Sequence, residues 1–396
     1  YLPSIQNLNS GKSLPQINIW DIPYTIPQLG YLTHSDFRYY GKFPPPVAGQ
    51  LLEQYAPKSE DGYVLDNFCG SGTTLVEAKL RSIPAVGVDV NPIAVLASNV
   101  KVRHIDLNGL RREANALLTH ADNVSVSPPS DEYVDKWFTC QARQELSQIL
   151  AGLHNVDDGQ LKDFLIIAFF AIIRRVSRAY DGEVRPHINP SKKERSPKKA
   201  YRKKLKEMIS DHFDFQENTD GNVKCYAAQS DNRALEHLSE NGRCELIVSH
   251  PAYLNSFDYT PAYKLENYWA QLLWPEASSL PLRGYVKGEL RAYPANEDIT
   301  SRYYRHLQET YAEAFRIQPK GGYLAVVIGD CTRKGHLEPV VDKTCALIER
   351  LGYKTVEINY RTTHYGLGKY AYSFRADYHG ERSEKKDAVV VFQKPS

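Results

Sequence analysis

Short apolar runs alternate with turn-rich and helical stretches along most of this 396-residue chain. Seven runs are rich in β-branched and apolar residues and are predicted to be strands: Val64–Leu65, Ala85–Val88, Val223–Ala227, Leu246–Ser249, Tyr323–Ile328, Thr355–Tyr360 and Ala388–Phe392. Turns and helical segments separate most of them, which is the pattern of a mostly parallel, doubly wound α/β sheet. The last two runs lie closer together and are expected to pair antiparallel.

A glycine turn follows the first of these runs. Gly70 and Gly72 form the turn, Thr73–Leu80 reads as a helix, and the next strand ends at Asp89, which stands 17 positions after Gly72. A glycine is required where a ligand lies too close to the backbone for a Cβ atom. A carboxylate at the tip of the second strand is well placed to accept hydrogen bonds from ribose hydroxyls.

The glycine spacing narrows the choice of nucleotide ligand. The turn matches neither G-x-G-x-x-G nor the phosphate loop G-x-x-x-x-G-K-[ST], which disfavours a dinucleotide and a nucleoside triphosphate. A nucleoside without phosphates remains, and S-adenosylmethionine is the most common cofactor of that kind.

More than a hundred residues separate the second and third strands. Residues 141–153 and 158–180 are predicted to be helices, and the second is apolar over nearly its whole surface, so it is expected to be buried. The stretch Arg185–Lys206 then has ten basic residues against one acid. Such a run is either a solvated loop or a contact for nucleic-acid phosphates, with Lys192, Lys193, Lys198 and Lys199 as the candidates.

A second motif follows the buried run Leu246–Ser249. It reads His250-Pro251-Ala252-Tyr253, at a strand end where sheets of this kind place their chemistry. A turn stiffened by proline and followed by an aromatic residue can hold a flat base, while polar acceptors meet its amino group. The alternative is an ordinary turn with a packing tyrosine. The stretch Ser127–Ser130 also contains Ser-Pro-Pro, but no strand precedes it, and it is predicted to be a loop.

Composition excludes several classes of protein. The chain is 42% hydrophobic and 24% charged with a net charge of +2, so any affinity for polyanions must come from local clusters. The longest apolar run, Phe164–Ile173, is too short to span a bilayer. The six cysteines form neither C-x-x-C pairs nor zinc spacings, which favours a reducing cytosol and no metal. None follows a proline, which excludes carbon-5 methylation of cytosine through a Pro-Cys thiolate.

Together these motifs resemble the amino-group DNA methyltransferases, which methylate the exocyclic nitrogen of adenine or cytosine. The resemblance covers roughly residues 34–396. D-N-F-C-G-S-G-T-T, beginning at Asp66, resembles the cofactor loop of the family, and H-P-A-Y resembles its catalytic motif. Ser230–Arg233 resembles the segment near the cofactor adenine, and Lys42–Pro46 the element that closes over its methionine end. The resemblance implies S-adenosylmethionine as cofactor and a flipped base in double-stranded DNA as substrate.

The resemblance also implies roles for individual residues. The expected cofactor contacts are Lys42, Pro44, Asp66, Phe68, Cys69, Gly70, Gly72, Thr73, Asp89, Val90, Asp231 and Asn232. The catalytic group is expected to be His250, Pro251, Ala252 and Tyr253, with Tyr253 as the stacking platform. Asn255, Phe257, Asp258 and Tyr259 are expected around the base, with core packing or helix capping as their alternative roles. A bacterial or archaeal, nucleoid-associated cytoplasmic enzyme with a restriction or defence-system partner is also implied.

Two positions depart from the family pattern. His250 stands where the family has Ser, Asn or Asp, and Ala252 replaces its second proline. In the family, the first side chain and the next backbone carbonyl accept hydrogen bonds from the target amino group. A neutral His250 accepts such a bond and a protonated one does not, while Ala252 loosens the turn. Slow or absent transfer is therefore expected, and the choice between adenine and cytosine is left open.

The expected fold is a Rossmann-like S-adenosylmethionine-dependent methyltransferase sheet, mostly parallel with an antiparallel last strand, plus a helical insertion. The predicted parts are an N-terminal arm (1–33), a catalytic domain (34–105 and 221–396) and a helical, basic insertion (106–220). The insertion is the first candidate for target recognition, and Pro275–Thr300 is the second. An RNA methyltransferase acting on transfer-RNA guanine, a catalytically impaired DNA-binding homologue, and a small-molecule methyltransferase are the alternative functions, in that order.

Overall fold

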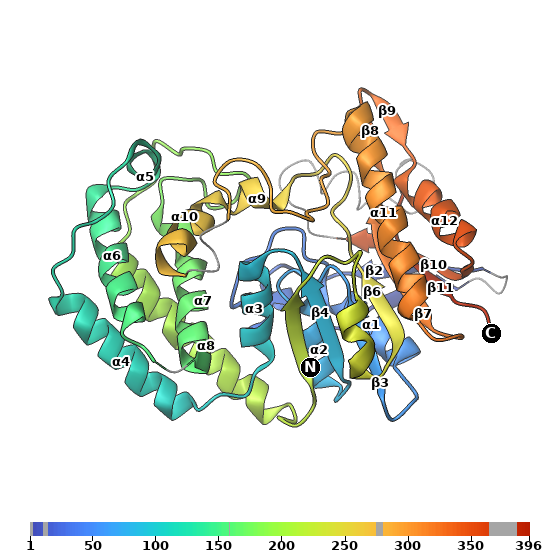
Figure 1. Cartoon of the computed structure of the whole chain (residues 1–396), viewed down its shortest axis with the longest axis horizontal. Helices are drawn as coiled ribbons and strands as arrows, with labels where there is room; N and C mark the ends of the chain where they lie inside the picture. Colours follow the sequence, from blue (N-terminus) through green and yellow to red (C-terminus); the bar gives the residue numbers. More distant parts are fainter. Residues whose placement is uncertain (1–2, 11–14, 158, 275–279, 364–385) are drawn as a thin grey trace.

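A computed structural model gives the fold, and it describes residues 3–10, 15–157, 159–274, 280–363 and 386–396 (Figure 1). Within them a nine-stranded sheet has the order β1-β2-β10-β11-β7-β6-β3-β4-β5. The strands are β1 (Gln6–Ser10), β2 (Gln16–Ile22), β3 (Gly62–Asp66), β4 (Ala85–Asp89), β5 (Cys225–Gln229), β6 (Arg243–Ser249), β7 (Tyr323–Gly329), β10 (Lys354–Thr363) and β11 (Asp387–Gln393). A separate hairpin consists of β8 (Cys331–Arg333) and β9 (His336–Glu338).

The direction of the strands confirms the predicted fold class. Strands β5, β4, β3, β6 and β7 are parallel neighbours, whereas β11 runs antiparallel to both β7 and β10. From β3 the chain builds the sheet towards β4 and β5, and β6 then returns to the other side of β3. The strand order thus reverses between β3 and β6. Ligands of open α/β sheets bind beyond the carboxyl ends of the strands at such a reversal.

The central strands are apolar throughout because both faces of the sheet are covered. In β3, Val64 packs in the core beneath α1 (Pro45–Tyr55) and α2 (Thr73–Leu80), whereas Leu65 packs in the opposite core. That second core includes residues of α11 (Glu297–Ile317) and α12 (Val340–Arg350). A strand buried on both faces loses the apolar–polar alternation of a half-exposed one. This explains why these strands were readable as continuous apolar runs.

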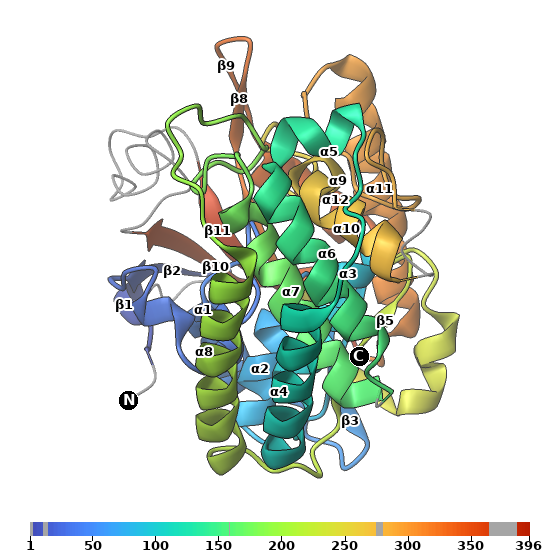
Figure 2. The same cartoon turned by 90° about the vertical axis from the view of Figure 1, so that its left-hand side faces the viewer.

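A group of helices lies beside the sheet, at the left of Figure 1, and Figure 2 shows α4 and α8 side by side within it. Its members are α4 (Leu107–Asn123), α5 (Glu132–Trp137), α6 (Cys140–His154), α7 (Gly159–Val176), α8 (Pro197–Glu217) and α10 (Lys264–Leu273). Helix α3 (Pro92–Val102) connects the group to the sheet, and its Ile93 and Leu96 belong to the same core. Helix α7 is buried along most of its length, as its apolar surface predicted. The Ser127–Ser130 segment is a loop, as expected.

No helix in the described part of the chain combines the length and the apolar character needed to cross a bilayer. The remaining short helices are the 3-10 helices η1 (Gln28–Gly30), η2 (Leu32–Ser35) and η3 (Glu236–Asn241), and α9 (Tyr259–Ala262). Helix α9 follows the strand-end motif of β6 and leads into the helical group. The path from β6 to β7 therefore passes over the carboxyl edge of the sheet.

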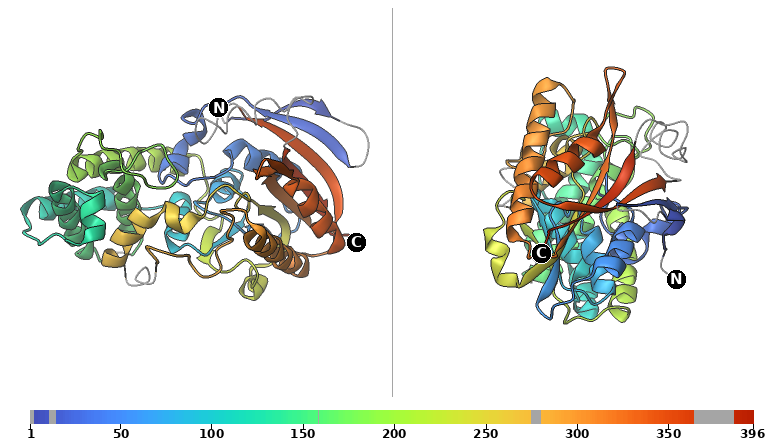
Figure 3. Two further views of the ribbon diagram at one scale, coloured as in Figure 1. Left: turned by 90° about the horizontal axis from the view of Figure 1, so that it is seen from above. Right: turned by 90° about the vertical axis from the view of Figure 1, so that its right-hand side faces the viewer.

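The N-terminal residues contribute two strands that the sequence pattern did not indicate. Strand β2 pairs parallel to β10 and extends the sheet at its edge, where the blue and red strands meet in Figure 3. Its inward positions include a polar residue, Asn18, which is 1% exposed and donates to Glu357 (2.6 Å) and Asn359 (2.7 Å). Trp20 and Ile22 fill the other inward positions. A buried asparagine interrupts the apolar alternation, which explains why the strand was not recognised.

Candidate functional site

The glycine turn leads from the end of β3 into α2 and is sterically tight. Gly70 and Gly72 have φ values of 48° and 80°, in the left-handed region that favours glycine. A Cβ atom on Gly70 would lie 2.6 Å from the Tyr39 ring, and one on Gly72 would lie 2.9 Å from the Ser98 hydroxyl. Both glycines are therefore required by the backbone conformation and by the neighbouring side chains.

Asp66 holds this turn from behind. It is fully buried and accepts hydrogen bonds from the Thr74 hydroxyl (2.5 Å) and the Phe68 amide (3.1 Å). Burial raises the pKa of its carboxyl to about 7, in spite of these hydrogen bonds. Cys69 packs against Gly87 of β4, and burial raises the pKa of its thiol well above the ordinary value. The thiol is thus a packing group rather than a nucleophile.

Asp89 connects the turn to the end of β4. One carboxylate oxygen accepts from the Gly70 amide (3.0 Å) and the other from the Asn91 amide (2.8 Å). Burial raises the pKa of this carboxyl to about 6. Asp89 also lines the cavity in front of the turn, and each of its carboxylate oxygens can accept a further hydrogen bond.

A cavity of about 800 Å³ opens in front of the turn and joins the two motifs. Residues from three strand ends line it together: the loop after β3, Asp89 at the end of β4, and His250 and Ala252 after β6. Eleven of the residues predicted for the site line this cavity: Lys42, Phe68, Cys69, Gly70, Thr73, Asp89, Val90, Asn232, His250, Ala252 and Tyr259.

Other predicted residues surround this cavity without lining it. Pro44 and Pro251 are buried, and Gly72 is the N-cap of α2. Asp231 forms an ion pair with Arg233 (2.6 Å). Phe257 packs on Tyr259, with 5.0 Å between the ring centroids.

Asn255 and Asp258 hold the segment that follows residue 290. Asp258 accepts from the amides of Ala292 (2.8 Å) and Tyr293 (3.1 Å), and Asn255 accepts from the Ala295 amide (3.3 Å). These side chains thus hold the backbone of a neighbouring loop, whereas Asp258, although it is the N-cap residue of α9, makes no capping hydrogen bond through its side chain. They fix the position of a loop that itself reaches the cavity.

The His250 ring lies between two aromatic rings. Phe43 and Tyr253 meet it edge-on, with centroid distances of 5.1 and 5.5 Å. The Tyr253 hydroxyl accepts a hydrogen bond from Arg361 (2.8 Å) and donates to Asp387 (3.2 Å), and its ring supports His250 rather than lining the cavity. The carbonyl of Ala252 accepts a hydrogen bond from the Tyr303 hydroxyl (2.9 Å), which helps to hold the turn.

The basic run is mostly used within the protein. Lys192 bonds to Asp181 (2.8 Å), and Lys198 and Arg202 both approach Asp122. Lys193 and Lys199 are exposed. None of these four lysines lines the cavity, so the structure separates the basic run from the two strand-end motifs.

Several residues of the cavity wall were not among the expected site residues, although Phe43, Asn67, Ser71 and Ser230 lie within the motifs quoted above. They are Tyr39, Gly41, Phe43, Asn67, Ser71, Asn91, Ser230, Thr260, Val286, Gly288, Glu289 and Leu290. The Tyr39 ring stacks on Tyr259, with 5.3 Å between centroids, and Glu289 accepts hydrogen bonds from the amides of Tyr259 (2.7 Å) and Thr260 (3.0 Å). Val286, Gly288, Glu289 and Leu290 lie within Pro275–Thr300, the second candidate for target recognition. No local sequence pattern marked these four residues individually.

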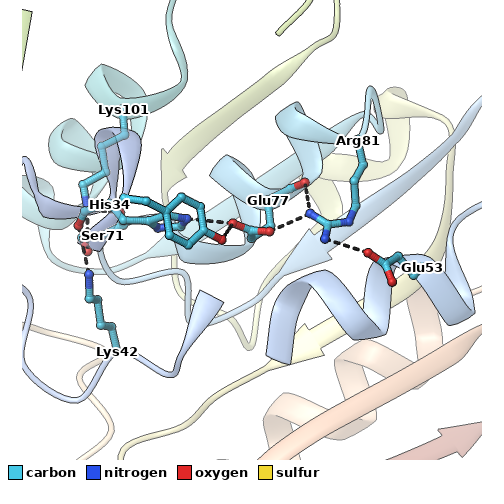
Figure 4. Close-up of polar contacts among 8 residues, drawn as sticks. His34, Lys42, Glu53, Ser71, Glu77, Arg81 and Lys101 are labelled. Carbon is cyan, nitrogen blue, oxygen red and sulfur yellow. Dashed lines mark hydrogen bonds and ion pairs between the residues drawn. The ribbon is translucent and has the colours of Figure 1, made fainter. Parts of the chain in front are cut away.

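A buried polar cluster supports the loop from the side of η2 (Figure 4). The Lys101 ammonium donates to the Ser71 carbonyl (3.0 Å), to the Ser71 hydroxyl (3.1 Å) and to the His34 carbonyl (3.4 Å). Lys42 donates to the same His34 carbonyl (2.9 Å). Burial lowers the pKa of Lys42 to about 8 and that of Lys101 well below its ordinary value. Two lysines thus tie the segment before α1 to the cofactor loop.

The His34 side chain extends this cluster to α2. Its ring nitrogen is 2.8 Å from Glu77, which also accepts from Tyr31 (2.5 Å) and Arg81 (2.6 Å). Burial lowers the pKa of His34 to about 4, so the ring is neutral at pH 7. Burial alone would raise the pKa of Glu77, but the hydrogen bond from His34 and its other partners lower it below the ordinary value.

The chemistry of the cavity wall fits S-adenosylmethionine. The wall includes two carboxylates, Asp89 and Glu289, and one ammonium group, Lys42. Carboxylates suit ribose hydroxyls and a positively charged sulfonium, whereas a phosphate group requires clustered donors or cations. Among the described residues, no group of three or more His, Cys, Asp or Glu is arranged to hold a metal ion.

Comparison with known proteins supports the same interpretation. A family described as DNA methylase matches residues 5–99. The chain is 28% identical over 249 residues to the Type II methyltransferase M.MvaI of Kocuria varians, covering 57% of this chain and 54% of the relative. It is 25% identical to M.AvaI of Nostoc sp. over 58% of this chain and 52% of that protein. The chain spans about half the length of these two curated relatives.

Solved structures give weaker similarities. TrmN from Thermus thermophilus aligns with 90% of this chain and 50% of its own, at 11% identity and a TM-score of 0.32. The rRNA methyltransferase aviRa from Streptomyces viridochromogenes aligns with a TM-score of 0.30 at 13% identity, covering 90% of this chain and 88% of its own. The fold assignment therefore rests on the strand order described above. Together with the sequence motifs, the family match and the curated relatives confirm the resemblance and relate this chain to the amino-group (N6-adenine and N4-cytosine) DNA methyltransferases.

Proposed function

We propose that this protein transfers a methyl group from S-adenosylmethionine to the exocyclic amino group of adenine or cytosine in double-stranded DNA. The observation that carries the proposal is the shared cavity. It joins the glycine turn and Asp89 to His250 and Ala252 at the point where the strand order reverses. A methyl donor and an acceptor base held in one cavity need no covalent intermediate, only alignment and exclusion of water.

On the cofactor side, residues of the cavity wall bind and orient S-adenosylmethionine. We assign Asp89 to the ribose hydroxyls, and the wall formed by Phe68 and Val90 to the adenine. Lys42 is placed to meet the carboxylate at the methionine end. The chemistry supplied by the bound cofactor is an activated methyl group on a positively charged sulfur.

On the substrate side, we assign the amino group to His250 and the Pro251 carbonyl. A neutral imidazole accepts one hydrogen bond through its unprotonated nitrogen, and the carbonyl accepts the second. These two bonds orient the lone pair of the attacking nitrogen. The proton on that nitrogen becomes acidic as the new bond forms, and solvent or His250 can take it. Phe43 and Tyr253 hold the His250 ring, and Tyr303 holds the turn through the Ala252 carbonyl.

Reaching the amino group in a duplex requires the base to leave the helix. We propose that the Tyr259 ring, which lines the cavity and stacks on Tyr39, provides an aromatic surface for it. We propose that the helical insertion at residues 106–220, with Lys193 and Lys199 exposed on it, contributes to target recognition. We also propose that the protein works beside a restriction partner; M.MvaI and M.AvaI are both named Type II methyltransferases.

A methyl-transfer assay tests the proposal. The purified chain is incubated with tritiated S-adenosylmethionine and a plasmid library of varied sequence, and single-molecule sequencing then locates the modified base. Incorporation into DNA that is lost in Asp89→Ala is the expected result. Asp61→Ala, an acid that precedes β3 outside the cavity, is the matched control. Incorporation into transfer RNA but not DNA would overturn the assigned substrate, and cofactor binding without any transfer would establish an impaired homologue.

A further inference from the structure

A second cavity, of about 850 Å³, lies among the helices and has no role in the proposed methyl transfer. The residues that define it are Arg38, Tyr40, Arg174, Arg175, Arg195 and Glu266. We call it the arginine cavity. Its arginines come from three places in the chain: the segment before α1, the end of α7, and the loop before α8. Only the tertiary structure brings them together.

The charge of the arginine cavity favours an anionic ligand. Four guanidinium groups face two carboxylates, Glu266 and Asp181. Asp181 already forms ion pairs with Lys192 (2.8 Å) and Arg195 (2.9 Å). Because Lys192 does not line the cavity, part of the negative charge of Asp181 is balanced by a group outside it. Guanidinium groups match the geometry of phosphate oxygens and bind them through paired hydrogen bonds.

Three buried polar atoms in this cavity have no hydrogen-bond partner within the described chain. They are the Tyr40 hydroxyl, Nε of Arg174 and Oε2 of Glu266. These residues are only 3%, 7% and 5% exposed. A buried polar atom without a partner costs about 1–3 kcal/mol, and most such atoms in proteins are satisfied by protein, water or ligand. Two of these atoms, the Tyr40 hydroxyl and Nε of Arg174, are donors, whereas Oε2 of Glu266 is an acceptor. Two donors without partners beside an excess of positive charge point to a bound polar anion.

The arginine cavity and the cofactor cavity share a wall. Along the chain, Arg38 and Tyr40 line the first, whereas Tyr39 and Gly41 line the second. Tyr39 stacks on Tyr263, which lines the arginine cavity, with 5.3 Å between the ring centroids. The Tyr40 ring also lies beneath the guanidinium groups of Arg38 (4.8 Å) and Arg174 (5.7 Å), which holds both in place.

We propose that the arginine cavity binds a backbone phosphate of the DNA strand whose base enters the cofactor cavity. This rests on the proposed function, which places a flipped base on the other side of the Tyr39 wall. The phosphates next to a flipped nucleotide remain attached to it, so a cationic pocket behind the wall fixes its backbone while the base is held in front. Such a contact adds affinity without reading sequence.

Duplex binding at several salt concentrations tests this proposal. Arg175→Gln is the main variant, because Arg175 is exposed on α7, and Arg38→Gln is the second. Arg112→Gln removes the same charge from α4, where the side chain is 74% exposed and is not among the residues that line the cavity. Fluorescence anisotropy with a short duplex of mixed sequence is expected to show about 10-fold weaker binding for each cavity variant. The slope of log affinity against log salt is expected to fall by about 1, with Arg112→Gln close to wild type.

Further variants and a second nucleic-acid ligand distinguish failure of this proposal from failure of the proposed function. Arg175→Lys retains the charge and is expected to restore the salt slope while recovering only part of the affinity. If all three glutamine variants weaken duplex binding equally, only net charge matters and the cavity is not a phosphate site. If the wild-type protein binds an RNA hairpin through these arginines and does not bind the duplex, both the phosphate-site proposal and the proposed function are overturned. Unchanged S-adenosylmethionine affinity in Arg175→Gln is required, since a loss would assign the cavity to the cofactor.

Discussion

Single carboxyl groups are expected to control how cofactor affinity depends on pH. In the proposed site Asp89 accepts hydrogen bonds from two ribose hydroxyls, which the ionised carboxylate does best, and burial raises its pKa to about 6. Because this folded-state pKa lies above the unfolded value, the protein without cofactor loses the stability contributed by protonated Asp89 as the pH rises through 6. The affinity for the cofactor depends on pH in the opposite direction and rises with pH, since binding requires the ionised form of Asp89.

S-adenosylmethionine affinity should therefore increase as the pH rises from 5 to 7, and should fall again above pH 8 as Lys42, whose pKa burial lowers to about 8, loses its charge. Below pH 6 the slope should approach roughly tenfold per pH unit, as for one required deprotonation. Calorimetric titration at a series of pH values measures this, with Asp89→Asn expected to bind about 10–100-fold more weakly. Asp66, whose pKa is about 7, also titrates in this range, so Asp66→Asn serves as the comparison. An affinity that stays constant from pH 5 to 8 contradicts the assignment of Asp89.

The residue at position 252 is expected to limit turnover rather than binding. Ala252 allows a wider range of backbone conformations than proline at the turn that carries the Pro251 carbonyl. Ala252→Pro should raise the transfer rate by about 2–5-fold, which corresponds to the roughly 0.4–1 kcal/mol gained by fixing one residue. Ala252→Gly should lower it. Single-turnover assays measure the rate, with the cofactor dissociation constant expected to stay unchanged; equal rates for all three proteins would show that position 252 is not limiting.

At the scale of elements, the link between Lys101 and the glycine turn is expected to organise the cofactor site. Lys101→Met removes the hydrogen bonds to Ser71 and should weaken cofactor binding about 5–10-fold, consistent with the loss of about 1 kcal/mol. Unfolding stability should change little, because methionine also removes a buried ammonium group that is costly to desolvate.

Lys79 provides the matched control for this link. It is a lysine of α2 that also donates to backbone carbonyls, those of Gly221 (3.2 Å) and Val223, but it does not line the cavity. Lys79→Met should leave cofactor affinity unchanged. Equal losses in both variants would mean that the effect is a general one on α2.

Strand β2 is expected to be an integral part of the core rather than a detachable arm. Trp20 is 1% exposed and packs in the core beneath α1, so Trp20→Ala should cost about 3–5 kcal/mol of unfolding free energy. Ile17 of the same strand is 42% exposed, and Ile17→Ala should cost less than about 1 kcal/mol. Denaturant titration of both variants measures the difference. Similar small costs would show that β2 contributes little to the core.

At the scale of the whole molecule, the cofactor cavity is built from distant segments, so its ligand should stabilise the entire fold. The segment before α1, the turn after β3, the end of β6 and the loop at 286–290 all contribute to the wall. S-adenosylmethionine at 100 times its dissociation constant should add about 2.7 kcal/mol to the free energy of unfolding. Thermal unfolding with and without cofactor measures this, and Asp89→Asn at the same concentration should show a smaller increase.

Much of the architecture could be predicted because its information is local. Strands β3, β4, β6 and β7 are largely buried and read as apolar runs, and the sequence pattern also indicated β5, β10 and β11. By contrast, β2 went unrecognised because Asn18 occupies an inward position. Its burial is possible only because Glu357 and Asn359, more than 300 residues away, accept its hydrogen bonds.

The sequence by itself determined the two strand-end motifs, since a glycine turn, an acid at a strand tip and a proline turn each act through residues adjacent in the chain. Their meeting in one cavity follows from the parallel order of β4, β3 and β6. Only the tertiary structure decided the rest: Tyr39 and Glu289 in the wall, Lys101 behind the turn, and the arginine cavity. Those groups come together through contacts between distant segments, and no local pattern of residues encodes such contacts.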